Sequence, residues 1–321
     1  QKKSKSAAKS GDMPLLITVI TLVAFGLLML YSSSADYSVE LLGEAPGYMF
    51  KRQLMWLGLG IIAATALSYL DYHYWRQLAV IAMLGAIGAL LTVLFIQEVR
   101  LGAVRTVYNG SIQPSELAKL VTVLYLAVWL YAKRAQIHSI ELGLVPLGII
   151  LGLVGGLIFL QPDLSATVTI FILGGMLFFL AGADLKQIIL LMLFASVAAL
   201  IIVKFSATGQ ERIQFYWLGL KDPNFASYHV RRSLEAMING GIFGLGIGQS
   251  VTKLTGLPVP PTDSIFAVIA EEFGLLGATA LIVLYALLVW RGLIIARRAP
   301  DMLGSLLATG LAFWIGIEAL V

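Results

Sequence analysis

Long apolar stretches recur along almost the whole chain, and they constrain its fold more than any other feature. A helix needs about 20 mostly apolar residues to cross a bilayer, and stretches of about this length occur nine times, at 14–34, 53–70, 77–97, 115–132, 142–160, 164–182, 187–204, 264–290 and 302–321. Only 12% of the residues are charged, about half the share found in soluble domains. The sequence therefore predicts an all-α polytopic membrane protein with about nine transmembrane helices.

Lysine and arginine residues are divided unequally between the two sets of loops. If the N-terminus is cytoplasmic, the inner side collects Lys2, Lys3, Lys5, Lys9, Arg76, Lys133, Arg134, Lys186, Arg291, Arg297 and Arg298. The short outer loops hold only Lys51, Arg52, Arg100 and Arg105. Cytoplasmic loops carry the excess of basic residues, so residues 1–13 are predicted to be a cytoplasmic tail before an uncleaved first helix. The chain, 1–321, is then one transmembrane domain.

The segment 205–262 is the one long loop, and the topology places it outside. Its middle, residues 233–249 (SLEAMINGGIFGLGIGQ), is apolar but too rich in glycine for a straight span. We expect a re-entrant or interfacial segment, which is tolerated at membrane depth only where it is buried in protein or lines a cavity. The GLGIG run does not indicate a dinucleotide site, because no strand precedes it.

Three of the expected helices begin at the outer side with proline and an acid. The starting sequences are QPSE at 113–116, QPD at 161–163 and PPTD at 260–263. Proline suits the first turn of a helix, and an acid there is favoured by the helix dipole. Capping explains each start alone, whereas three together are typical of helix ends that line a binding cavity. Asp163 is accordingly either a cap or an organiser of nearby cations.

Basic residues near these helix starts indicate an anionic ligand. The candidates beside the starts or in the long loop are Arg105, Lys119, Arg212, Arg232 and Lys253. Helix N-termini combined with arginine favour phosphate or pyrophosphate. Part of this charge has a simpler explanation, because Glu116 and Lys119 are three residues apart on one helix and can pair. His229, in the long loop, is a further candidate for substrate contact.

Three acids belong to the helix expected at 264–290 or to its outer end. Ionisable groups inside membrane segments are costly and functional by default. Asp263, at the outer end, is placed to act as a general base. Glu272, about 13 Å deeper at 1.5 Å per residue, is the alternative base and otherwise a structural or gating group. Glu271 and Glu272 point about 100° apart, so at most one of them faces a shared cavity.

Four motifs in order resemble one known family. They are QPSELAK at 113–119, QPDLSAT at 161–167, YHVRRSLEAMINGGIFGLGIGQS at 228–250 and LPVPPTDSIFAVIAEEFG at 257–274. On these motifs the chain resembles the SEDS family (shape, elongation, division and sporulation), which includes RodA and FtsW. The resemblance implies ten helices, so we expect the end within the ninth span to be a truncation. Pro261 departs from the family, which usually has histidine there.

The resemblance implies an inverting glycosyltransferase that polymerises lipid II into peptidoglycan strands at the outer face of the cytoplasmic membrane, in cell division or elongation. It assigns catalysis to Asp263, which follows Thr262, and it implies a class B penicillin-binding protein as transpeptidase partner. Lipid II, an undecaprenyl-pyrophosphate-linked disaccharide peptide, and membrane lipids are the expected ligands; nucleic acid is not. The candidate substrate-binding residues are Arg105, Glu116, Lys119, Asp163, Arg212, Arg232, Lys253, Thr262 and Glu272.

Other interpretations stay open at this point. The sequence has no dedicated metal cluster, but the chemistry allows a divalent cation, Mg²⁺ or Mn²⁺, between Asp263 and the pyrophosphate. A lipid II flippase or transporter would use the same cavity, and intramembrane acids such as Glu116 and Glu272 suit a transport path. A related ligase of lipid-linked glycans would share the chemistry with another acceptor. A purely structural division scaffold would leave the outer charges unexplained.

Overall fold

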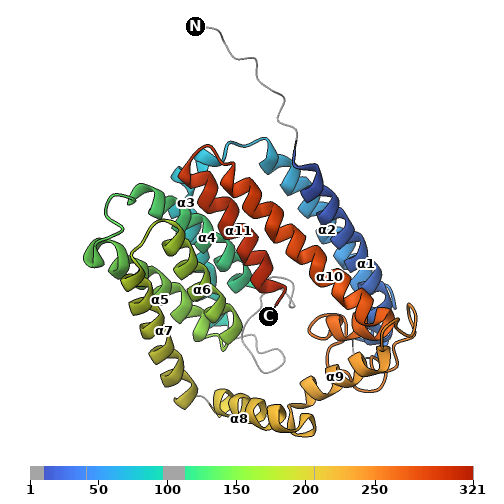
Figure 1. Ribbon diagram of the computed structural model, residues 1–321. Coiled ribbons are helices and arrows are strands. Elements are labelled where there is room, and N and C mark those ends of the chain that lie inside the picture. Colours follow the sequence, from blue (N-terminus) through green and yellow to red (C-terminus); the bar gives the residue numbers. More distant parts are fainter. Residues whose placement is uncertain (1–10, 41, 97–112, 206, 321) are drawn as a thin grey trace. The chain divides into compact units, whose positions relative to one another are not determined.

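The computed structural model describes residues 11–40, 42–96, 113–205 and 207–320, and all regular elements in these ranges are helices (Figure 1). The helices are α1 (Met13–Glu40), α2 (Tyr48–Ser68), α3 (Trp75–Ile96), α4 (Pro114–Ala132), α5 (Val145–Phe159), α6 (Leu164–Leu180), α7 (Leu185–Phe205), α8 (Ala207–Lys221), α9 (Tyr228–Gly240), α10 (Ile265–Arg297) and α11 (Met302–Glu318), with short helical turns η1 (Tyr72–Tyr74), η2 (Ile140–Leu144) and η3 (Pro223–Phe225). Each expected span overlaps a helix over most of its described residues, and the all-α prediction is confirmed. Helices α8 and α9 lie in the long loop.

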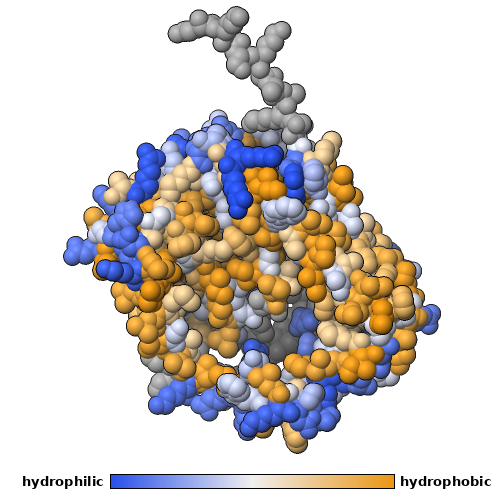
Figure 2. All heavy atoms as spheres, in the orientation of Figure 1, coloured by the Kyte–Doolittle hydropathy of each residue, from blue (hydrophilic) through white to orange (hydrophobic). Residues whose placement is uncertain are grey.

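Many of these helices present apolar side chains outward. Ile62 is 68% exposed and Phe95 is 84% exposed, and hydrophobic residues cover much of the visible surface (Figure 2). Five described helical stretches are long and apolar enough to cross a membrane: Met13–Glu40, Tyr72–Phe95, Pro114–Ala132, Ile140–Phe159 and Ile265–Arg297. So much exposed apolar surface suits contact with lipid rather than water. The chain is a polytopic membrane protein; nine spans and a cytoplasmic N-terminus stay predictions.

The chain divides into two compact units. Of the described residues, those within 1–69 and 202–288 form one unit, and those within 70–201 and 289–321 form the other. In the second unit, α4 packs against α3, α6 and α11, while α5 packs against α6. Leu126 and Leu130 of α4 are fully buried. Gly310 lets α11 approach α4 closely, since a Cβ there would lie 2.6 Å from Cγ1 of Val123.

The core of the first unit joins helices that are far apart in the sequence. Met29 of α1, Ala236 of α9 and Val268 of α10 are all fully buried in it. The rings of Phe25 and Phe273 meet edge to face, with centroids 5.3 Å apart. The start of α10 is therefore held by α1 and by the long loop.

Helix α10 is broken at Gly274, which has non-helical dihedral angles of φ 68° and ψ −169°. The break frees backbone groups on both sides, and the glycine-rich loop after α9 pairs with them. The N–H groups of this loop donate to α10 and its carbonyls accept from α10, through Leu245 N–H to Glu271 O (3.0 Å), Gly246 N–H to Glu272 O (3.0 Å), Leu275 N–H to Gly241 O (2.9 Å) and Leu276 N–H to Ile242 O (3.2 Å). The span expected at 264–290 is thus two helical halves.

Glycines make this backbone junction possible. A Cβ at Gly240 would lie 2.0 Å from the carbonyl oxygen of Ala270, and a Cβ at Gly244 would lie 2.2 Å from that of Glu272. Gly244 and Gly274 also have positive φ angles, of 82° and 68°. Irregular backbone needs such protein partners wherever water is excluded. Gly240 and Gly244 therefore serve close packing against α10, and the depth of this segment in the membrane stays a prediction.

Asp301 caps α11 and ties it to the turn before α3. Its Oδ1 accepts hydrogen bonds from the Gly304 N–H (2.7 Å) and the Tyr72 hydroxyl (3.2 Å), and its Oδ2 lies 2.8 Å from Nε2 of His73. Burial would raise the pKa of the Asp301 carboxyl group, but the Gly304 N–H and the His73 ring hold that pKa below its ordinary value. Such a carboxylate stabilises the fold above its ordinary pKa, and this contribution is lost as the pH falls through the lowered value.

Asp301→Ala is expected to lower the stability of the protein by about 1 kcal/mol near neutral pH, because it removes a helix cap. Asp301→Asn, which keeps an acceptor at the cap position, should cost less. Thermal unfolding in detergent measures both. The gap between wild type and Asp301→Ala should begin to shrink as the pH falls below about 4, the ordinary pKa of aspartate, and its charge-dependent part should be lost below the lowered pKa at which the folded protein takes up the proton. A gap that is unchanged in acid would contradict this account.

Candidate active site

Asp263 lies in the turn at 256–264, which leads into the first half of α10. The side chains of Asp263 and Thr262 are exposed, whereas Pro261 and Ser264 on either side of them are buried. The turn is therefore fixed by its buried residues and presents the carboxylate outward. An exposed carboxylate on a fixed turn is available to a ligand, as the prediction for Asp263 requires.

The backbone of this turn is strained. Val259 has a φ of 41°, which a β-branched residue rarely adopts. Strain of this kind costs about 1–3 kcal/mol and persists only where the surroundings enforce it. The Ser264 hydroxyl donates to the Pro258 carbonyl (2.5 Å) and lies 3.1 Å from Nε2 of His229. Since that hydroxyl has only one hydrogen, it accepts from the Nε2–H of His229, which connects α9 to the turn.

Two of the predicted substrate-binding residues, Lys253 and Glu272, pair with each other. Nζ of Lys253 lies 2.9 Å from Oε1 of Glu272, and their side chains are only 6% and 0% exposed. The Ser32 hydroxyl of α1 donates to the same carboxylate at 2.7 Å. The pair is therefore enclosed by α1, α10 and the long loop, within the first unit.

Glu271 is fully buried and has neutral partners. Its carboxylate accepts from the hydroxyls of Ser250 and Thr252, from the Thr252 N–H (3.3 Å) and from the Asn239 amide (3.5 Å). Glu271 and Glu272 thus point to different partners, in agreement with the predicted separation of about 100° between consecutive helical residues. Sequence reasoning missed Ser250 and Thr252 because hydroxyl residues of a loop carry no signal of such a role.

Lys119 of α4 is buried between two acids in the second unit. Its Nζ lies 2.8 Å from Oε1 of Glu116 and 2.5 Å from Oε1 of Glu318, and its side chain is 3% exposed. The predicted pairing of Glu116 with Lys119 is therefore present. Glu318 was not predicted, although an acid in an apolar helix is itself a signal of function. Two carboxylates compensate the charge of Lys119.

Asp163 caps α6 and joins it to the start of α4. Its Oδ1 accepts from the Ala166 N–H (3.1 Å), and its Oδ2 accepts from the Gln113 amide (3.0 Å) and the Ser115 hydroxyl (3.1 Å). Helix α4 begins at Pro114, as the sequence predicts. Of the two roles considered for Asp163, these contacts favour the cap.

The predicted arginines differ in their surroundings. The guanidinium group of Arg232 bonds to the Glu235 carboxylate and to the Thr255 hydroxyl (2.9 Å). Arg212 is exposed on α8, and Arg105 lies outside the described residues. Arg212 is thus a more accessible cation than Arg232.

The described residues contain no group of three or more His, Asp or Glu side chains arranged to hold a metal ion. A single exposed carboxylate such as that of Asp263 nevertheless fits Mg²⁺ when substrate phosphates supply further oxygen ligands. Any cation at this site would depend on the substrate for much of its binding.

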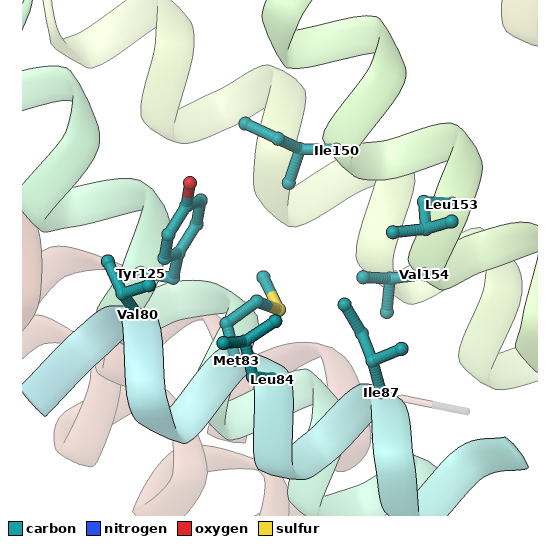
Figure 3. Close-up of a pocket in the computed structure, with 8 residues that line it drawn as sticks. All are labelled: Val80, Met83, Leu84, Ile87, Tyr125, Ile150, Leu153 and Val154. Atoms are coloured by element: carbon teal, nitrogen blue, oxygen red, sulfur yellow. The ribbon is translucent and has the colours of Figure 1, made fainter.

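A pocket in the second unit lies among α3, α4 and α5 (Figure 3). Its lining consists of Val80, Met83, Leu84, Ile87, Tyr125, Ile150, Leu153 and Val154. The Tyr125 hydroxyl is the one polar side-chain group in this lining, so the pocket does not suit a phosphate. It is therefore separate in character from the acid-bearing turn.

Comparisons with known proteins agree with the motifs. The family model for cell cycle proteins of the FtsW, RodA and SpoVE type matches residues 13–321. Stage V sporulation protein E of Bacillus subtilis is 35% identical, with 97% of this chain and 86% of the relative covered. The "Probable peptidoglycan glycosyltransferase FtsW" of Coxiella burnetii is 33% identical, with 100% and 88% covered.

Solved structures share the fold. A chain in a peptidoglycan synthase complex ("Structural coordination of polymerization and crosslinking by a peptidoglycan synthase complex") matches with a TM-score of 0.74 at 26% identity, over 97% of this chain and 85% of that chain. The rod shape determining protein RodA of Thermus thermophilus matches with a TM-score of 0.68 at 24% identity, over 98% and 84%. The chain belongs to the family of FtsW, RodA and SpoVE, the SEDS family that its four motifs resemble.

Proposed function

We propose that this protein is an inverting glycosyltransferase that polymerises lipid II into peptidoglycan strands at the outer face of the cytoplasmic membrane. The observation that carries the proposal is the exposed carboxylate of Asp263 on a strained, anchored turn at the start of α10. Family membership supports it, since relatives are described as probable peptidoglycan glycosyltransferases.

Asp263 has the chemistry and the exposure of a general base. Its carboxylate takes the proton from a hydroxyl group of the acceptor sugar as the oxygen of that hydroxyl bonds to the anomeric carbon of the donor sugar. The bond between this carbon and the pyrophosphate oxygen breaks, and its electron pair leaves with the pyrophosphate. Attack from the face opposite the leaving group inverts the anomeric centre. A positioned base contributes about 10²–10⁴-fold to such a reaction.

The departing pyrophosphate requires positive charge. Arg212 is our first candidate among the described residues, because it is exposed, whereas Lys119 and Arg232 are paired with carboxylates. Thr262 is exposed beside Asp263 and can hydrogen-bond to the sugars. A divalent cation bound by Asp263 and the phosphates would supply further charge neutralisation.

A transpeptidase of the class B penicillin-binding protein type is the proposed partner. A solved relative belongs to a peptidoglycan synthase complex, and polymerised strands must be crosslinked by a second activity. The partner would act on the strands that this protein produces on the outer side of the membrane.

The enzyme and the transporter interpretations make different predictions for the purified protein. We expect the protein, together with its cognate transpeptidase, to convert labelled lipid II into long glycan strands that are resolved by gel electrophoresis. Liposomes that contain the protein should not scramble labelled lipid II between leaflets faster than empty liposomes. Scrambling without any polymer would support the transporter instead. Adding EDTA and then restoring Mg²⁺ or Mn²⁺ tests the proposed cation separately.

A further inference from the structure

Two consecutive buried acids of α10 hold the segment that precedes the turn at 256–264, which carries Asp263 and is called the Asp263 turn below. Glu271 binds Ser250 and Thr252, and Glu272 binds Lys253. Ser250, Thr252, Glu271 and Glu272 are each at most 2% exposed. The loop at 250–253 is therefore fixed to the C-terminal end of the first half of α10, just before the break at Gly274.

This attachment means that the chain is fixed to α10 both before and after the turn at 256–264. The turn at 256–264 begins a few residues after Lys253, and it ends where α10 begins at Ile265. The Leu257 N–H also donates to the Thr252 carbonyl at 3.1 Å, which links the start of the turn to the attached segment. Both ends of the turn are consequently fixed to the same half-helix, which explains how the strained conformation of Val259 can persist.

The ammonium group of Lys253 is fully occupied within the protein. Its Nζ lies 2.9 Å from Oε1 of Glu272, 3.0 Å from the Gly248 carbonyl and 3.2 Å from the Ser32 carbonyl. An ammonium group has three hydrogens to donate, and three acceptors already surround this one. Lys253 has no remaining donor for a substrate phosphate, although sequence reasoning had grouped it with the phosphate ligands.

We propose that Lys253 and Glu272 are positioning residues, which hold the Asp263 turn in its reactive conformation and do not bind substrate. This inference rests on the proposed function of Asp263 as the base. Removing one partner leaves the other charge buried without compensation, which is more disruptive than removing both. The pair therefore acts through the position of Asp263, and Glu271 supports it from the neighbouring position on α10.

The first test follows the turn itself, without substrate. The chain has no cysteine, so spin labels can be placed specifically at Thr262→Cys in the turn and Asp36→Cys on α1, both of which are exposed. Pulsed electron paramagnetic resonance should give a narrow distribution of distances between the two labels in the otherwise unchanged protein. Lys253→Met should broaden or shift it, and Lys253→Met combined with Glu272→Gln should largely restore it. An unchanged distribution in the single variant would overturn the proposal.

The second test uses polymerisation kinetics with lipid II, in protein without the labels. We expect Lys253→Met to lower kcat at least tenfold and to change KM less than about threefold, because a misplaced base slows chemistry without removing a binding contact. The double variant should recover most of the lost kcat. A raised KM with unchanged kcat would instead make Lys253 a substrate ligand. Lys221→Met, at an exposed lysine at the end of α8, is the matched control.

The two tests separate this inference from the function on which it rests. If the wild type makes no polymer, the proposed function fails, whereas the distance measurement still decides whether the pair holds the turn. If the single variant does not fold, the double variant decides: recovery of folded protein together with the wild-type distance supports the positioning role. A double variant that folds with the turn displaced overturns it.

Discussion

Asp263→Asn is expected to abolish detectable glycan polymerisation while the protein still folds. The substitution keeps the size of the side chain but removes its ability to accept the proton of the attacking hydroxyl. The expected loss is at least about 100-fold in kcat, the lower end of the contribution of a general base. Because the side chain is exposed, the melting temperature should change little. Strand formation from labelled lipid II, with the cognate transpeptidase present, measures the loss.

Asp36→Asn is a matched control for this experiment. Asp36 is another exposed aspartate, on α1 of the same unit, and it has no proposed role in the reaction, so its replacement should leave the rate unchanged. Full activity in Asp263→Asn would remove Asp263 from the mechanism and return Glu272 to consideration as the base. Loss of folded protein in Asp263→Asn would show that the carboxylate is structural.

The positions of the helices could be predicted from the sequence because they depend on local properties. Apolar length locates the spans, and Pro114 and Asp163 mark the starts of α4 and α6 through the chemistry of the first helical turn. The position of Asp263 before α10 and not inside it was also predictable, since the proline-rich stretch before it cannot form part of a helix interior. In each of these cases the signal lies within a few residues of the feature.

The contacts of α10 could not be predicted in the same way because they join distant segments. The break at Gly274 depends on residues 241–246, which pair with the freed backbone groups. A lone glycine in an apolar helix does not by itself predict such a break. The partner of Lys253 could not be identified from the sequence either. Its charge suggested a phosphate, whereas the fold brings Glu272 and Ser32 to it.

The second large effect is expected at the glycine junction. Gly240→Ala places a methyl group where a Cβ would lie 2.0 Å from the Ala270 carbonyl oxygen and 2.7 Å from Cα of Glu271. Both neighbours are backbone atoms, so no side chain can rotate away to make room. Overpacking of this kind typically costs about 1–3 kcal/mol and occasionally more, and here it also separates α9 from the half-helix that leads to Asp263. We expect a clear loss of folded protein and of the melting transition. Size-exclusion chromatography and thermal unfolding in detergent measure these two losses.

Gly248→Ala distinguishes close packing from the general cost of losing a glycine. Gly248 has a positive φ of 80° but no atom within 4 Å of the position of a Cβ, so alanine there should be strained by only about 1 kcal/mol. Gly240 does not have a positive φ, so its effect should come from steric contact alone. If Gly240→Ala is as stable as Gly248→Ala or more so, the backbone junction is not what fixes the long loop to α10. If Gly240→Ala is much less stable, as we expect, the close backbone packing of α9 against the first half of α10 contributes strongly to the stability of the fold.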